Sequence, residues 1–150
     1  CGAYFREHMP NLKIVGVELR TTNEVAFHEI PKLWQRFYQE GVLAQIPNKV
    51  SNDVYAVYTN FENEGKNNEG TYSLILGAEV SSLDGVPEAL ASTVVNAAKR
   101  RVFEVPAGQP HKVGEKWQEI WSLSDHKKTF IADYECYRES GEIEILVGIS

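Results

Sequence analysis

The chain has 150 residues, of which 43% are hydrophobic, and its formal net charge is -6 at pH 7. A chain of this length forms one sizeable core but is too short for two ordinary domains. The acidic balance argues against direct nucleic-acid binding, which depends on clustered Lys and Arg. No segment approaches the roughly 18 apolar residues of a membrane span, and a signal-peptide pattern is absent. We therefore expect a cytoplasmic protein with no membrane contact.

The first eight residues, CGAYFREH, precede Met9, the single methionine of the sequence. We interpret residues 1–8 as an N-terminal arm or an expression remnant and predict a domain over residues 9–150. Its first predicted element is a strand over residues 11–20, NLKIVGVELR, which precedes the first helix.

An amphipathic helix is predicted over residues 29–41, EIPKLWQRFYQEG, with Pro31 in its first turn and Gly41 as its C-terminal stop. Apolar residues recur in it at helical spacing. They are Ile30, Leu33, Trp34, Phe37 and Tyr38.

Two strands and a packed connection follow this helix. The first strand contains YAVY at residues 55–58, and the second covers residues 70–77, GTYSLILG. The polar residues 60–70 between them form a predicted hairpin loop. Residues 81–98 include the apolar run ALASTVV, which indicates a packed connection to the rest of the chain.

The second half repeats the order of the first. A strand over residues 99–106 precedes a helix over residues 112–124, whose apolar residues are Val113, Trp117, Ile120 and Trp121. A strand containing YECY at residues 134–137 and a strand over residues 141–148 complete it. The two helix patterns, each with a Trp-Gln pair, match at a constant offset in sequence.

The repeat predicts an α+β fold in which duplicated strand-helix-strand-strand units form an antiparallel sheet. Two helices then flank a central ligand groove floored by strands. In this arrangement Glu135 of YECY is equivalent to Ala56 of YAVY. Because alternate strand residues share a face, Tyr137 lies on the side of Glu135, and Tyr55 and Tyr134 lie on the other. One carboxylate is thus predicted near a pseudo-two-fold axis.

The segments LWQRFY, YSLILGAEV, KRRVFEVPAG, KWQEIWSLS and DYECY resemble the GyrI-like family, the effector-binding domain of many AraC-type and multidrug-responsive regulators. The likeness extends over about residues 11–150. It looks strongest toward stand-alone members, such as integron cassette-encoded proteins that bind cationic drugs. The resemblance implies that Glu135 is the central acid of the ligand cleft and that Tyr137 accompanies it. The helix-turn-helix of the family's regulators is absent from these 150 residues.

We predict that the partners of this chain are cationic aromatic small molecules. A carboxylate among aromatic rings is costly to desolvate and is stabilised when an organic cation enters, and the rings add cation-π attraction. The predicted ligand-binding residues are Glu135, Tyr137, Trp121, Trp34, Tyr38, Tyr58, Tyr72 and Trp117. Trp34 and Trp117 occupy equivalent core positions, so plain packing is an equal interpretation for them.

Two other functions remain open at this stage. The family has relatives that hydrolyse small electrophiles, and Glu135 as base with Tyr137 as proton donor could do the same. The family's namesake acts on DNA gyrase, so inhibition of a protein partner is the other alternative, although no residue pattern selects such a partner. The four histidines lack metal-ligand spacing and phosphate-binding Gly-rich loops are absent, so no metal or cofactor is predicted.

Overall fold

The structure, a computed structural model, describes residues 3–6, 12–22, 24–62, 70–88, 90–95, 100–106, 108, 112–122 and 132–148. Its elements are β1 (Ala3–Arg6), β2 (Leu12–Thr22), α1 (Ala26–Gln39), α2 (Val42–Gln45), β3 (Val54–Thr59), β4 (Thr71–Val80), β5 (Ala91–Val95), β6 (Arg100–Val105), α3 (Val113–Ser122), β7 (Ala132–Tyr137) and β8 (Ile143–Gly148). The strands form one sheet in the order β1-β6-β8-β7-β3-β4-β2-β5, and neighbouring strands are antiparallel. The predicted α+β class is confirmed.

The sheet order also confirms the internal duplication. The first unit is β2-α1-β3-β4 and the second is β6-α3-β7-β8, and each unit places its last strand between its other two. The two units meet where β3 pairs with β7. The spatial order β2, β4, β3 is therefore reversed as β7, β8, β6, as a pseudo-two-fold axis at the β3-β7 pair requires.

Two edge strands lie outside the repeat. Within the connection predicted over residues 81–98, β5 pairs with β2, so this segment is packed against the sheet as expected. Within residues 1–8, β1 pairs with β6 and extends the other edge. Residues 63–69 of the predicted hairpin loop lie outside the described part of the chain.

Helix α1 begins earlier than its sequence pattern predicts. It starts at Ala26, where the Val25 carbonyl accepts hydrogen bonds from the backbone N–H groups of His28 and Glu29 at 3.0 and 3.1 Å. Pro31 is therefore in the second turn, and its placement in the first turn was wrong. No side chain caps the helix start, so the usual sequence signal is missing. The predicted stop is confirmed, because Gly41 follows the helix with a left-handed φ of 61°.

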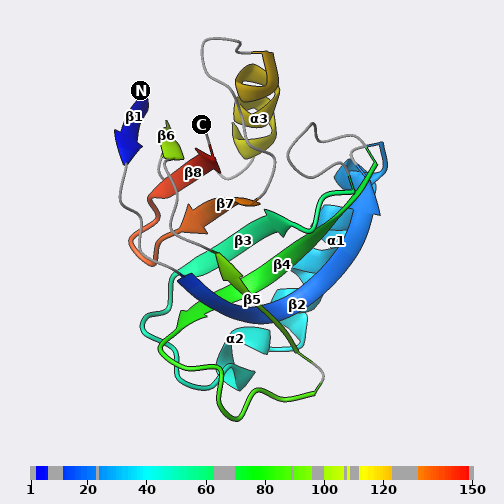
Figure 1. The fold of residues 1–150 in the computed structure, drawn as a ribbon, viewed down its shortest axis with the longest axis vertical. Helices are drawn as coiled ribbons and strands as arrows, with labels where there is room; N and C mark the ends of the chain where they lie inside the picture. Colours follow the sequence, from blue (N-terminus) through cyan, green and yellow to red (C-terminus); the bar gives the residue numbers. More distant parts are fainter. Residues whose placement is uncertain are drawn as a thin grey trace.

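The helices pack on one face of the sheet, where α1 lies behind β4 and β2 in Figure 1, and the described core of the other face consists of strand residues. Leu33 and Phe37 of α1 pack on residues of β2, β3 and β4, whereas Val113, Trp117 and Ile120 of α3 pack on residues of β6 and β8. The opposite face buries a separate cluster that includes Tyr55, Val57, Tyr134 and Cys136. Tyr55 and Tyr134 are thus structural residues of the far face, as strand alternation predicts.

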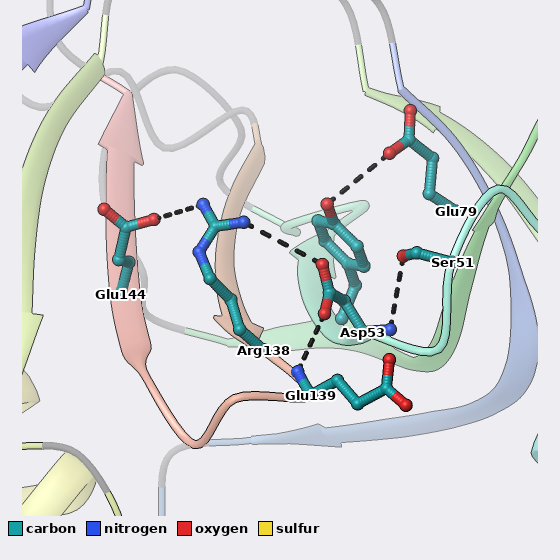
Figure 2. Close-up of polar contacts among 7 residues, drawn as sticks. Ser51, Asp53, Glu79, Arg138, Glu139 and Glu144 are labelled. Carbon is teal, nitrogen blue, oxygen red and sulfur yellow. Dashed lines mark hydrogen bonds and ion pairs between the residues drawn. The ribbon is translucent and has the colours of Figure 1, made fainter.

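A polar network fastens β3 to β7 at one end of their pairing (Figure 2). The Asp53 carboxylate accepts a hydrogen bond from the Glu139 backbone N–H at 2.8 Å and lies 3.8 Å from the Arg138 guanidinium. Arg138 also donates to Glu144 of β8 at 2.6 Å. These contacts join the entry of the first unit's β3 to the β7-β8 turn of the second unit.

Candidate functional site

The candidate site lies on the helix-bearing face at the centre of the sheet. Ala56 of β3 and Glu135 of β7 are directly opposed in the register of the two strands. Ala56 packs in the cluster beneath α1, so the Glu135 side chain lies on the same face. The position predicted from the repeat is confirmed, and it falls at the junction of the two units.

Glu135 is 2% exposed and accepts hydrogen bonds from three aromatic side chains. Its Oε2 atom accepts from the Tyr58 hydroxyl at 2.7 Å and from Trp117 Nε1 at 2.5 Å. Its Oε1 atom accepts from the Tyr137 hydroxyl. The donors come from β3, α3 and β7 itself, so the two repeat units together hold this carboxylate.

No described Lys or Arg forms an ion pair with Glu135. Burial raises the pKa of the Glu135 carboxyl above its ordinary value, and the hydrogen bonds from Tyr137, Tyr58 and Trp117 act in the opposite direction. Burial and the negative charge of Glu135 likewise raise the pKa of Tyr58 and Tyr137, which keeps both phenols as donors. The site is therefore a desolvated carboxyl with donors for its charged form but no described cation.

Aromatic rings surround this carboxylate on both sides of the unit junction. Tyr58 and Tyr137, both half-buried, pack against the α1 core and also against the α3 core. The ring of Trp34 from α1 meets Tyr137 edge-on with centroids 4.9 Å apart, and Trp117 from α3 meets Tyr58 edge-on at 5.4 Å. Trp34 and Trp117 thus belong to the core stripes of their helices and also reach the residues around Glu135.

Two of the remaining predicted site residues, Tyr72 and Tyr38, lie farther from the carboxylate. Tyr72 is buried and its ring contacts Tyr58 at 5.8 Å, one ring away from Glu135. Tyr38 is 64% exposed and stacks on Trp34 at 6.0 Å, so it lies at the outer end of the ring series. Trp121 is within α3, but its side chain lies outside the described part of the structure. Its predicted role stays a prediction.

One aromatic residue near the site was missed by the sequence argument. Phe61 is buried, and its ring lies 5.8 Å from that of Tyr72. It follows β3 within a polar segment, NFENEG, where it is the single apolar residue. An isolated aromatic side chain in a polar loop is the signal that could have identified it.

Other kinds of site find no support in the described residues. They contain no group of three or more His, Cys, Asp or Glu side chains arranged to hold a metal ion. None of the helices found there is long and apolar enough to cross a membrane. The arrangement around Glu135 can hold a negative charge against aromatic surface, and that is a means of recognising a positively charged ligand.

Three solved structures share the fold over nearly the whole chain. Integron cassette protein VCH_CASS2 from the mobile metagenome of Vibrio cholerae is 24% identical, with a TM-score of 0.79, and the match covers 99% of this chain and 96% of that one. SAV2435, whose structure contains tetraphenylphosphonium, is 18% identical, with a TM-score of 0.82 and coverage of 100% and 94%. A candidate transcription regulation protein from Staphylococcus aureus MU50 is 18% identical, with a TM-score of 0.76 and coverage of 99% and 98%.

No curated protein matches the sequence significantly. A family model described as Cass2, integron-associated effector binding protein, matches residues 7–149. This match spans both repeat units and confirms the family resemblance expected from the sequence. The protein therefore belongs to the Cass2 family of integron-associated effector binding proteins, and its function class is small-molecule binding.

Proposed function

We propose that this protein binds lipophilic aromatic cations, with the Glu135 carboxylate as the charge partner and the surrounding rings as the walls of the site. The observation that carries this proposal is a carboxylate that is 2% exposed and contacts three aromatic donors but no described cation. The walls we propose are Tyr58, Trp117, Tyr137 and Trp34, with Tyr72 and Tyr38 farther out. Trp121 is kept as a further wall residue on the sequence pattern alone.

The energetics of Glu135 favour a cationic ligand over a neutral one. A buried charge without a counter-ion is destabilised, and hydrogen bonds offset only part of the desolvation. An entering cation provides the missing charge in surroundings of low dielectric, where the attraction is strong. A neutral ligand of the same shape leaves that cost unchanged. Charge selectivity follows from the burial itself.

The rings add an attraction that suits a lipophilic cation. A cation over the face of a Tyr or Trp ring gains roughly 0.5–2 kcal/mol, depending on its desolvation. Tyr58 and Tyr137 both reach Glu135 and both pack against the two helix cores, so a cation beside the carboxylate is also beside these rings. Flat or propeller-shaped aromatic substituents then extend over Trp34 and Trp117.

The relatives support this choice of ligand class. The family is one of effector-binding proteins, and SAV2435, which shares the fold, was solved with tetraphenylphosphonium, a lipophilic aromatic cation. The shared fold and the effector-binding family together favour a lipophilic aromatic cation as the class of ligand.

Thermal shift and calorimetric titration with methyltriphenylphosphonium and its neutral relative triphenylphosphine oxide test the proposal. The cation is expected to stabilise the protein as RT ln(1 + [L]/Kd), about 2.7 kcal/mol at a hundredfold excess over Kd. Glu135→Gln removes the charge at nearly constant shape. It is expected to weaken binding of the cation by about 2–5 kcal/mol, or 30-fold to several thousandfold in Kd.

Glu79→Gln is the matched control for this experiment. Glu79 is a half-buried strand glutamate, its carboxylate lies 3.5 Å from the Tyr55 hydroxyl, and Tyr55 belongs to the helix-free face. Its substitution is expected to leave cation affinity unchanged. Equal shifts with the two phosphorus compounds, or equal losses in both glutamate variants, contradict the proposal. The hydrolytic alternative is tested separately, by mass spectrometry after incubation with a small hydrolysable electrophile such as p-nitrophenyl acetate, because the phosphorus compounds are stable to hydrolysis near neutral pH.

A further inference from the structure

We propose that the site selects fixed cations without N–H groups, such as quaternary ammonium or phosphonium, over protonated primary and secondary amines. This inference rests on the proposed function, because it concerns how the Glu135 site chooses among cations. Its basis is the number and placement of the hydrogen bonds that Glu135 already accepts within the protein.

The acceptor capacity of Glu135 is nearly full. A carboxylate has about four lone-pair positions, two on each oxygen. Oε2 accepts from Tyr58 and Trp117, and Oε1 accepts from Tyr137. About one position is left for a ligand, although the full negative charge of the group is still there to attract a cation. The site therefore keeps the charge that attracts a cation but has little capacity left to accept hydrogen bonds from it.

The remaining position is on the Tyr137 side of the carboxylate. Oε2 faces Trp117, which is buried under α3. Oε1 faces Tyr137, which is half-buried and whose ring contacts the half-buried Trp34. Trp34 in turn stacks on the exposed Tyr38, so the series of rings from Oε1 reaches the surface. A ligand that contacts Glu135 with least rearrangement approaches along these rings.

An ammonium group with several N–H donors is poorly matched to this environment. Its first N–H can use the remaining position on Oε1, but each further N–H has only phenol oxygens, which are weaker acceptors than a carboxylate, and the faces of the rings. An unsatisfied buried donor loses its hydrogen bond to water without a replacement. A quaternary ammonium or phosphonium has no donor to satisfy and gains the full charge attraction. The number of N–H groups therefore determines affinity.

The test is a calorimetric series of four ligands in which one biphenylbutyl group carries a trimethylammonium, dimethylammonium, methylammonium or ammonium head. The three amines stay protonated at pH 7, because a Lys-like ammonium has a pKa of about 10. Ligands with no or one N–H are expected to bind similarly. Each further N–H is expected to weaken binding about tenfold.

Tyr137→Phe separates the effect of hydrogen bonding from that of the added methyl groups. The variant keeps the ring against Trp34 and exchanges the weakly accepting phenol oxygen for a second acceptor position on Oε1, which is the stronger acceptor. The methylammonium ligand, with two N–H groups, is expected to gain about tenfold relative to the trimethylammonium ligand. Tyr55→Phe removes a phenol from the opposite face and is expected to keep the wild-type ranking. Circular dichroism confirms that each variant is folded.

The outcomes distinguish this inference from the proposed function. A wild-type ranking that ignores N–H count, or a Tyr137→Phe ranking identical to that of wild type, overturns the selectivity while charge-dependent binding stands. Failure of all four ligands to bind, or binding that is insensitive to Glu135→Gln, overturns both proposals.

Discussion

Ala56 and Glu135 are directly opposed in the pairing of β3 with β7, at the junction of two repeated units. They are equivalent residues of YAVY and YECY, so the pseudo-two-fold axis brings a position and its own counterpart together. One of the two is a carboxylate and the other is an alanine that is 0% exposed. At the junction of the two repeated units, this pair of equivalent positions therefore has a carboxyl group on one side only.

Ala56→Glu is expected to turn this pair into two opposed carboxylates. Both would lie in buried surroundings, so repulsion and desolvation raise the pKa of at least one of them. A raised carboxyl pKa in the folded state lowers stability as pH rises through that pKa. Urea unfolding is therefore expected to show a larger loss at pH 7 than at pH 5. Ala56→Gln has the same size without charge, and equal losses for the two variants at both pH values contradict the prediction.

The wild-type protein is expected to show a related pH dependence without ligand. Burial raises the pKa of Glu135 above its ordinary value of 4.5, so the folded state binds this proton more tightly than the unfolded state does. The contribution of Glu135 to unfolding free energy is therefore most favourable below the ordinary pKa and decreases as pH rises through the folded pKa. Comparing urea unfolding of wild type and Glu135→Gln from below the ordinary pKa to above the folded pKa isolates this contribution, because the variant has no titrating carboxyl at position 135. If both proteins show the same pH dependence of the unfolding free energy, that dependence comes from other groups.

Cation affinity is expected to have the opposite pH trend. The ionised carboxylate attracts the ligand, so the affinity of methyltriphenylphosphonium rises as Glu135 loses its proton. The phosphonium charge itself does not titrate. Calorimetric titrations over the same pH range are expected to show this rise in wild type and a flat profile in Glu135→Gln. A flat wild-type profile contradicts the assignment of the charge to Glu135.

The two rings at the outer end of the series are expected to differ in importance. Trp34 contacts Tyr137 at 4.9 Å, whereas Tyr38 contacts Trp34 and is 64% exposed. Trp34→Ala is expected to weaken a flat aromatic cation by about 1–3 kcal/mol, because ring contact and cation-π attraction are both lost. Tyr38→Ala is expected to weaken binding of the same cation less. Calorimetry of both variants with one ligand checks the order, and a larger loss for Tyr38→Ala reverses it.

Gly77→Ala is expected to destabilise the fold. Gly77 faces Gly16 in the β2-β4 pairing, and a Cβ atom on Gly77 would lie 1.9 Å from the Val15 carbonyl oxygen. Backbone must move to relieve this contact, which is expected to cost about 3 kcal/mol in unfolding free energy. Gly114→Ala in the first turn of α3 is the control, because a Cβ there has nothing within 4 Å, and this substitution is expected to change stability by less than about 1 kcal/mol. Urea unfolding of both variants measures the contrast.

Arg138→Met is expected to lower the unfolding free energy by weakening the polar contacts that connect β3 to β7. Its guanidinium bonds to Glu144, whose side chain is only 9% exposed, and lies near Asp53. The substitution removes one charged partner of the largely buried Glu144 carboxylate, at an expected cost of about 2–4 kcal/mol. Adding Glu144→Gln removes that charge and is expected to recover part of the loss, as a double-mutant cycle can measure. Additive losses indicate that the two side chains are not coupled.

The sequence by itself determined the order of elements within the two repeat units, the faces of their strands and the position of Glu135 in the sheet, but it did not predict β1, α2 or β5. Period-two alternation placed Glu135 and Tyr137 on one face and Tyr55 and Tyr134 on the other, and the repeat identified Ala56 as the counterpart of Glu135. These inferences held because strand alternation and duplication are properties of the backbone that depend little on distant contacts. The start of α1 was misjudged because no capping side chain marks it.

Only the tertiary structure decided which side chains hold the carboxylate. The Tyr58 donor is 77 residues from Glu135, in the other repeat unit, and the Trp117 donor is 18 residues away, on α3 of the same unit. Helical periodicity places Trp34, Tyr38 and Trp117 on the apolar faces of their helices. It does not determine how each helix is rotated and shifted on the sheet. That rotation is set by the packing of many side chains at once. It directs Trp117 Nε1 to Glu135 and leaves Tyr38 at the surface.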